Sequence, residues 1–316
     1  MSLLALRPWH LLCLLACLTG SADVSAQPNL SRQPDLSIID QGSAYYTFER
    51  MLATSHDGLR RYRIVLAVPK KVAPANGYPV IYLLDGNAAL DALDAQLLAT
   101  LDSADAPVIV AIGHDTDQRF DPASRAYDYT PPVAGNAAPV DDRGRAGGGA
   151  ASFLDLIVGT IQPAVARKVH VDGRRQTLWG HSYGGLFVLH ALLNSPQSFQ
   201  RYVAASPSIW WQHGAILEHE ASGRAAIMAL PPEQRPTLTI LLGSEEGRRR
   251  AQLPPAQTDM RTSVSPDAAQ QFAQRMAADR LIEVDFRILD GLDHGPMLSA
   301  SLTRALRLAA GLPSLP

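Results

Sequence analysis

A serine between two glycines is the first feature of this sequence that could do covalent chemistry. Residues 178–189 read LWGHSYGGLFVL and place Gly-x-Ser-x-Gly around Ser182. At average glycine and serine usage this pattern occurs by chance in about one chain in ten of this length. Here it follows an apolar strand-like run and opens a helical one, the setting of a nucleophile elbow. We predict that Ser182 is a nucleophile at a strained turn, where Gly180, Gly184 and Gly185 let strand and helix approach.

A serine hydroxyl needs a general base before it can attack a carbonyl. In folds with this elbow the base is a histidine that follows the serine and the acid along the chain. His294 lies in DGLDHGPM (290–297), after the last apolar strand and before the last helix, and is the predicted base. His190 falls within the helix after the elbow. His213 and His219 fall in a long excursion between elements, so structural roles suit all three better.

The acid is expected after the strand that precedes the histidine strand. LLGSEEG (241–247) offers two glutamates there, and Glu246 has the better spacing from the end of the strand. A buried carboxylate at this point would fix the tautomer of His294 and stabilise its imidazolium. Two solvated loop glutamates, Glu245 and Glu246, are nearly as plausible an interpretation. Asp290 and Asp293 flank His294 and are weaker candidates, so the sequence leaves a Ser–His dyad and a Ser–His–Glu triad open.

Two backbone N–H groups should hold the oxyanion that forms during attack. The N–H of Tyr183 follows the nucleophile and is the first donor. The second should come from the loop after the third strand-like run, LLDGN (83–87), where Gly86 permits close backbone approach. The Gly86 N–H, or that of Asn87, is predicted to serve, with Asp85 fixing the turn.

Strand-like and helical stretches alternate along most of the chain. Apolar or alternating runs predict strands over 61–69, 78–86, 106–114, 175–182, 202–208, 237–244 and 282–291. Helical spacing covers 87–101, 152–169, 184–195, 267–280 and 299–311. Such alternation predicts an α/β fold with a mostly parallel central sheet and helices on both faces, in one domain over residues 43–316. The strand–elbow–helix at Ser182 makes this the α/β-hydrolase fold. Three stretches fall outside the alternation, 115–150, 209–236 and 245–266, and each follows the carboxyl end of a strand, where such sheets bind ligands.

The first residues are typical of an export signal. A basic start, a short apolar run (11–20) and the small-residue site VSA (24–26) predict a signal peptide over residues 1–26 and a periplasmic protein. Residues 27–42 are expected to form an extended lead-in. Cys13 and Cys17 both lie inside the apolar run, so signal removal would leave no cysteine. A lipoprotein-like reading of LLAC (14–17), or an uncleaved signal, would instead tether the protein to a membrane.

Composition excludes several function classes. The 316 residues carry a net charge of −2 and no long basic stretch, which argues against a nucleic-acid partner. Histidines such as His114 and His170 are scattered, so no metal cluster is expected. The predicted protein needs no cofactor.

Read together, six blocks resemble the esterase D–like branch of the α/β-hydrolases, and within it the IroE-like periplasmic siderophore esterases. The blocks are residues 77–94, 107–114, SRAYDYTP (124–131), LWGHSYGGLFVL (178–189), AASPSIWW (204–211) and 293–306. The resemblance implies a serine esterase that opens the trilactone ring of catecholate siderophores, enterobactin and salmochelin, with or without iron. The chain departs from that family at Glu245 and Glu246, where the family lacks a firm acid, and at SIWW.

The resemblance also implies that Arg125 faces the acidic catecholate groups. Arginine suits catechols through its planar donor fork and its stacking on rings. Tyr127, Trp210 and Trp211 could add aromatic walls, although core packing is as good an interpretation of the tryptophans. A salt bridge from Arg125 to Asp121 or Asp128 is the competing interpretation.

Two other functions remain open at this point. One is a broader carboxylesterase or acyltransferase of the same branch. The other is a non-catalytic siderophore-binding protein that has kept the fold. The Ser182–His294 pair argues against the second, because a binding protein has no need of a strained elbow.

Overall fold

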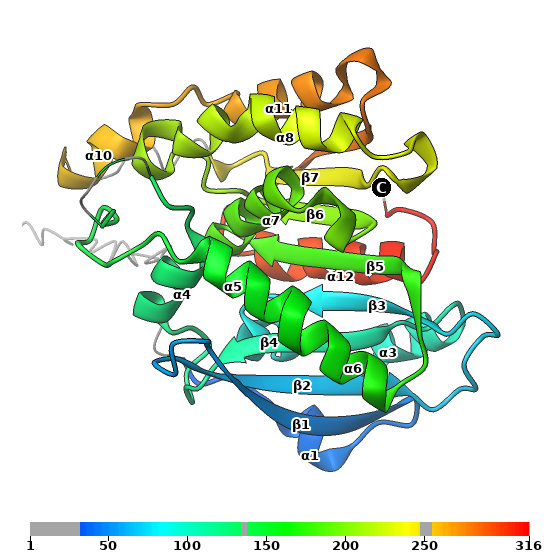
Figure 1. The fold of residues 1–316 in the computed structure, drawn as a ribbon. Helices are drawn as coiled ribbons and strands as arrows, with labels where there is room; N and C mark the ends of the chain where they lie inside the picture. Colours follow the sequence, from blue (N-terminus) through cyan, green and yellow to red (C-terminus); the bar gives the residue numbers. More distant parts are fainter. Residues whose placement is uncertain (1–31, 134, 136–137, 247–254, 316) are drawn as a thin grey trace, which may run out of the picture.

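A computed structural model describes residues 32–315 except 134, 136–137 and 247–254 (Figure 1). The predicted signal peptide therefore lies outside the described residues. Within the described residues, no helix has the length and apolar character needed to cross a bilayer.

One eight-stranded sheet organises the molecule, in the order β1-β2-β4-β3-β5-β6-β7-β8. The strands are β1 Tyr46–Thr54, β2 Arg61–Pro69, β3 Tyr78–Leu83, β4 Val108–His114, β5 Val171–His181, β6 Arg201–Ala205, β7 Thr237–Gly243 and β8 Glu283–Leu289. The pairs β1–β2 and β2–β4 are antiparallel, and every pair from β4 to β8 is parallel. The predicted mostly parallel sheet is confirmed, and the order is that of an α/β-hydrolase.

Helices cover both faces of the sheet because its central strands are apolar on both sides. On β3, for example, Val80 and Tyr82 point into one core while Ile81 and Leu83 point into the other. The first core is covered by α4 Pro122–Tyr129, α5 Ala150–Leu156, η1 Ile157–Ile161, α6 Gln162–Lys168, α7 Tyr183–Asn194, η3 Trp211–His219, α8 Glu220–Met228 and α11 Ala268–Ala277. The second is covered by α1 Ser37–Gln41, α2 Gly86–Leu90, α3 Ala95–Asp102 and α12 Met297–Ala309. Figure 1 shows α5, α6 and α7 in front of the sheet and α12 behind it.

Short elements complete the fold. They are η2 Pro196–Ser198, η4 Pro232–Gln234, α10 Pro255–Thr262 and η5 Ala278–Arg280. In Figure 1, α4 and α10 lie beyond the arrowheads of the parallel strands, at the carboxyl edge of the sheet. The excursions that contain them thus emerge at the predicted edge.

Several elements differ from the sequence prediction. The lead-in 27–42 is not wholly extended, because its isoleucines form helix α1 and Ile39 is buried in the second core. The single helix expected over 87–101 is two helices, since the Asp94 carboxylate accepts the Leu97 N–H at 2.7 Å and starts α3 afresh. The irregular stretch 115–150 contains α4, which begins at an Asp121 N-cap followed by Pro122.

Candidate active site

Ser182 occupies a sharp turn between β5 and α7. Its backbone has φ 61° and ψ −115°, a conformation that costs a non-glycine residue about 1–3 kcal/mol. A backbone hydrogen bond to the neighbouring strand stabilises the turn: the Ser182 N–H donates to the Ala205 carbonyl of β6 at 2.9 Å. The predicted strained elbow is therefore present, and it directs Ser182 toward the carboxyl edge of the sheet.

The glycines around Ser182 are not equivalent. A Cβ on Gly180 would overlap the backbone of Gly184, whose Cα would lie 2.9 Å away. A Cβ on Gly185 would stand 2.6 Å from the Ala205 carbonyl oxygen. At Gly184, in contrast, the nearest atom is Leu84 Cβ at 3.6 Å, which is ordinary contact. Close approach therefore requires glycine at 180 and 185 but not at 184.

This difference predicts opposite results for two matched substitutions. Gly180→Ala should destabilise the protein by about 3 kcal/mol or more, because two backbone segments must separate. Gly184→Ala should leave stability unchanged or raise it by up to about 1 kcal/mol, since alanine favours helix and the methyl has room. Chemical denaturation of both variants checks this. Equal destabilisation would show that the turn does not rest on the Gly180 contact.

Ser182, His294 and Glu246 form one hydrogen-bonded chain. The connection from β8 to α12 brings His294 Nε2 to 3.1 Å from Ser182 Oγ. On the other side of the ring, Nδ1 lies 3.0 Å from Glu246 Oε2, just after β7. The three side chains come from the carboxyl ends of β5, β7 and β8. This geometry matches what a serine nucleophile, a general base and an orienting carboxylate require.

The carboxylate of Glu246 is well supported. Its second oxygen, Oε1, accepts the Ser206 hydroxyl at 2.6 Å and the Gly243 N–H at 2.8 Å. Burial opposes its ionisation, but hydrogen bonding and charge from His294, together with the bonds from Ser206 and Gly243, outweigh burial. The pKa of Glu246 is consequently lower than its ordinary value. An ionised carboxylate here fixes the Nδ1–H tautomer of His294, which leaves Nε2 free to accept the serine proton.

The other acidic candidates are placed differently. Asp293 uses Oδ1 to accept the His294 backbone N–H at 2.6 Å, and Asp290 accepts the Ser244 hydroxyl at 3.3 Å. The Glu245 N–H donates to the Leu292 carbonyl. Of the candidates, Glu246 is the one whose carboxylate is hydrogen-bonded to the imidazole.

Both predicted oxyanion donors stand at helix starts, where N–H groups have no acceptor within the helix. Tyr183 is the first residue of α7, and Gly86 is the first residue of α2. The two starts are neighbours, because Asp85 Oδ2 lies 3.8 Å from where a Gly184 Cβ would stand. Gly86 also needs to be glycine, since a Cβ would stand 2.7 Å from the Gly113 nitrogen.

Asp85 fixes the oxyanion turn, as predicted, and it does so by binding Arg125. Asp85 is buried, and its backbone adopts the left-handed conformation with φ 51°. Its N–H donates to the Tyr129 hydroxyl at 2.9 Å. Its carboxylate accepts Arg125 Nε at 3.0 Å and Nη2 at 2.8 Å. Arg125 thus forms a salt bridge, as the competing interpretation held, but with Asp85 instead of Asp121 or Asp128. The Nε and Nη2 edge of its guanidinium is therefore already occupied by Asp85.

The predicted aromatic walls are largely packing. Trp211 is fully buried, donates Nε1–H to the Pro131 carbonyl at 3.4 Å and contacts Tyr183 edge-on. It cannot line a substrate site, so this prediction is wrong. Trp210 is 8% exposed, because Tyr183 covers one side and the Arg261 guanidinium lies 3.9 Å from the ring centroid. Tyr127 is half-buried, and the Arg60 guanidinium carbon lies 4.3 Å from the centroid of its ring.

Sequence reasoning missed four residues at this site. Ser206 supports Glu246, and Ser208 Oγ lies 3.3 Å from Ser182 Oγ. His181 packs on the ring of His294, and Arg261 covers Trp210. A usable signal existed for the serines, because SPS (206–208) follows directly on the buried strand β6 at the ligand-binding edge. None existed for Arg261, whose contact is set by tertiary structure.

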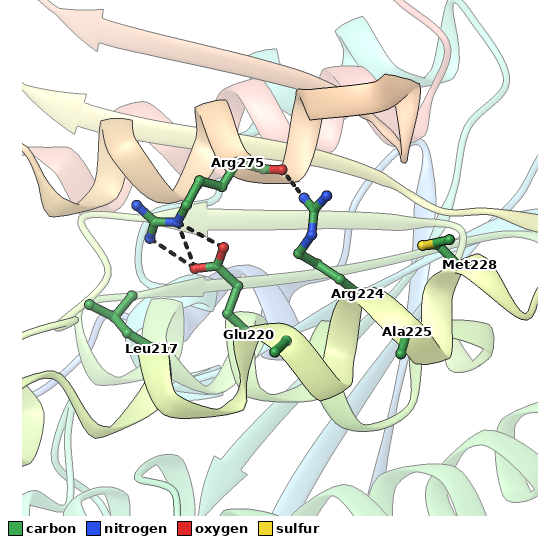
Figure 2. A pocket seen from close by; sticks show the side chains of 7 residues that line it. Leu217, Glu220, Arg224, Ala225, Met228 and Arg275 are labelled. Atoms are coloured by element: carbon green, nitrogen blue, oxygen red, sulfur yellow. Dashed lines mark hydrogen bonds and ion pairs between the residues drawn. The ribbon is translucent and has the colours of Figure 1, made fainter.

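A separate hollow of about 600 Å³ lies between α8 and α11 (Figure 2). Figure 2 shows the Glu220 carboxylate paired with Nε and Nη2 of Arg275, and Arg224 donating to the Arg275 carbonyl. None of its lining residues belongs to the Ser182 chain. Its charges are satisfied internally, so it offers no reactive group. Among the described residues no cluster of three or more His, Cys, Asp or Glu side chains could hold a metal ion.

Comparison with known proteins places this architecture. The Esterase family model ("Putative esterase") matches residues 55–304. The apo-salmochelin esterase of Escherichia coli O6:H1 is 38% identical over 305 residues, covering 94% of this chain and 89% of the relative. The chain belongs to the IroE-like esterases. The predicted resemblance is confirmed.

Two further relatives are also named as siderophore-ester hydrolases. The siderophore triacetylfusarinine C esterase of Aspergillus fumigatus is 38% identical over 248 residues, covering 73% of this chain and 80% of the relative. The solved structure of the enterobactin hydrolase IroE in complex with DFP is 36% identical, with a TM-score of 0.69, and covers 87% of this chain and 99% of the other. This protein is thus an ester hydrolase with the α/β-hydrolase fold.

Proposed function

We propose that this esterase hydrolyses the lactone esters of catecholate siderophores through a Ser182–His294–Glu246 triad. The observation that carries the proposal is the continuous hydrogen-bonded chain from Ser182 Oγ to the Glu246 carboxylate. The substrate class is supported by relatives whose names specify salmochelin and enterobactin esterases. A relative of equal identity acts on a different siderophore, so the shared feature is a siderophore ester.

The proposed reaction runs through an acyl-enzyme. Ser182 Oγ attacks the ester carbonyl carbon while His294 Nε2 takes the hydroxyl proton, and the carbonyl oxygen becomes an oxyanion. The N–H groups of Tyr183 and Gly86 donate to that oxyanion. Collapse breaks the ester C–O bond, and His294 returns the proton to the leaving alkoxide. Water then attacks the acyl-enzyme with His294 again as base, which releases the carboxylic acid and regenerates Ser182.

For substrate binding we propose two arginines beside this centre. Arg125 neighbours the oxyanion turn through Asp85, and its guanidinium lies 5.6 Å from the Tyr183 ring centroid. Arg261 is 27% exposed and covers the less exposed Trp210. A ligand that approaches Trp210 from the side of Arg261 would contact the Arg261 guanidinium before the Trp210 indole. Anionic, planar catecholates suit such arginines. We also propose Tyr127, which lies in the same helix as Arg125, as an aromatic contact for the substrate.

Relative rates on three esters test the substrate class. We expect kcat/KM on enterobactin and on salmochelin to exceed that on a short p-nitrophenyl ester by at least about tenfold, because binding energy from remote groups lowers the barrier. Each siderophore is assayed iron-free and iron-loaded, with iron entering as part of the substrate. A clear preference for the small ester would favour a broad carboxylesterase instead.

We further propose a periplasmic location, supported by the basic, apolar and small-residue pattern of residues 1–26. Mass analysis of the exported protein measures this. A chain that starts at Gln27 is expected, and a retained, lipid-modified Cys17 would point to a membrane tether.

A further inference from the structure

His181 precedes the nucleophile and lies against the catalytic base. Its ring centroid is 4.6 Å from that of His294, with 43° between the planes. His181 ends β5 and is buried, with 6% of its surface exposed, whereas the His294 side chain is 30% exposed. The base is therefore open to solvent in part and backed by a buried ring on another side.

The polar atoms of His181 do not take part in the triad. Its Nε2 is buried and has no hydrogen-bond partner among the residues that the structure describes. Burial, and then the charges of His294 and Arg125, lower the pKa of His181 well below its ordinary value, although the nearby His294 backbone acts in the opposite direction. The ring is accordingly neutral. An unpartnered buried nitrogen destabilises the fold, so the packing of this residue is not optimised for stability alone.

The contact matters because His294 must keep two hydrogen bonds at once. Its Nε2 faces Ser182 and its Nδ1 faces Glu246, at 3.1 and 3.0 Å. Tilting the ring to relieve one bond would stretch the other. A flat neighbour restricts that tilt. A neutral ring also tolerates the imidazolium that forms during attack, since a cation is attracted to an aromatic face.

We propose that His181 is a positioning residue that holds the His294 imidazole between Ser182 and Glu246 by ring packing. The inference rests on the proposed triad. His181 touches no reacting atom and acts through His294.

Two variants separate a ring from mere bulk. His181→Leu keeps an apolar side chain without a flat face, and His181→Phe keeps a neutral ring. Both remove the unpartnered nitrogen and the polar contact of the ring with the His294 backbone. We expect Leu to lower kcat by about tenfold or more with little change in KM, as small misplacements of a catalytic group do. Phe should recover kcat to within about threefold of the wild type.

His190→Leu is the matched control. His190 is likewise buried, and its Nε2 has no hydrogen-bond partner among the described residues, but it lies within α7, where its ring neighbours Phe187 and hydrogen-bonds to Asn194. The control should change the melting temperature without changing kcat. The low-field NMR signal of the proton between His294 and Glu246 should persist in His181→Phe and broaden in His181→Leu.

Folded His181→Leu with wild-type kcat would overturn the proposal, as would His181→Phe impaired as strongly as His181→Leu. If His181→Leu does not fold, His181→Met supplies the same comparison. Ser182→Ala is assayed alongside. Activity in that variant would refute the triad itself, whereas an inactive Ser182→Ala with an active His181→Leu refutes only the role of His181.

Discussion

Replacing Ser182 by alanine should lower kcat on siderophore esters by about 10⁴- to 10⁶-fold, the range seen when a serine nucleophile is removed. The loss is large because the acyl-enzyme can no longer form, and only binding and the oxyanion donors remain. KM should change little, since the hydroxyl contributes mainly to the transition state. Steady-state kinetics on purified protein measures both parameters. DFP, which reacts with active-site serines, should label the wild type and not the variant.

Ser208→Ala is the informative control for this variant. The Ser208 hydroxyl lies 3.3 Å from that of Ser182, so it is an alternative nucleophile. Within the described part of the chain its side chain has no hydrogen bond to His294, and its removal should lower kcat by less than about tenfold. If Ser208→Ala were inactive while Ser182→Ala kept its rate, Ser208 would be the nucleophile.

Replacing Glu246 by glutamine should lower kcat by about 10²- to 10⁴-fold. The carboxylate uses one oxygen for His294 and the other for Ser206 and Gly243. A glutamine must turn its NH₂ group toward one side. If the NH₂ group faces His294, it meets Nδ1–H, so two donors oppose each other and the required tautomer is disfavoured. If the NH₂ group faces the other way, it meets the Gly243 N–H, which is also a donor. Kinetics on the folded variant measures the loss.

Glu245→Gln is the matched control and should keep kcat within about threefold, because its carboxylate is not the one bonded to His294. Stability gives a second readout. A carboxyl whose folded pKa lies below its ordinary 4.5 stabilises the fold above that pH and loses the contribution as pH falls through the lower value. The melting temperatures of wild type and Glu246→Gln should therefore converge as the pH falls below 4.5 and through the lower folded-state pKa of Glu246. A Glu246→Gln enzyme within threefold of wild type would favour a dyad.

Much of this site follows from local pattern. Ser182 was predicted because an apolar strand, a glycine-bounded turn and an apolar helix meet within twelve residues, and His294 because it lies between the last strand and helix. Strands such as β2 were predicted to their observed bounds. Strand β1 was missed because it is an edge strand with mostly exposed positions, which leaves little apolar pattern. Helix α4 was missed although its Asp121–Pro122 start was readable.

Side-chain partners could not be predicted in the same way. Arg125 has several aspartates nearby in sequence, yet it binds Asp85, forty positions away. Trp210 and Trp211 are adjacent, yet one is covered by a cation and the other is sealed in the core. Such choices depend on which elements meet at the carboxyl edge, and that is fixed by the sheet order rather than by local sequence.

The wide spacing of the triad along the chain ties activity to the completion of folding. Ser182 and His294 are 112 positions apart, and His294 follows the final strand of the sheet. Contacts between such distant positions form slowly, because closing a long loop costs chain entropy before the contact energy can offset it. A partly folded chain with a formed elbow still lacks its base. With the proposed triad, a folding intermediate that lacks β8 also lacks its base and cannot hydrolyse an ester by this route.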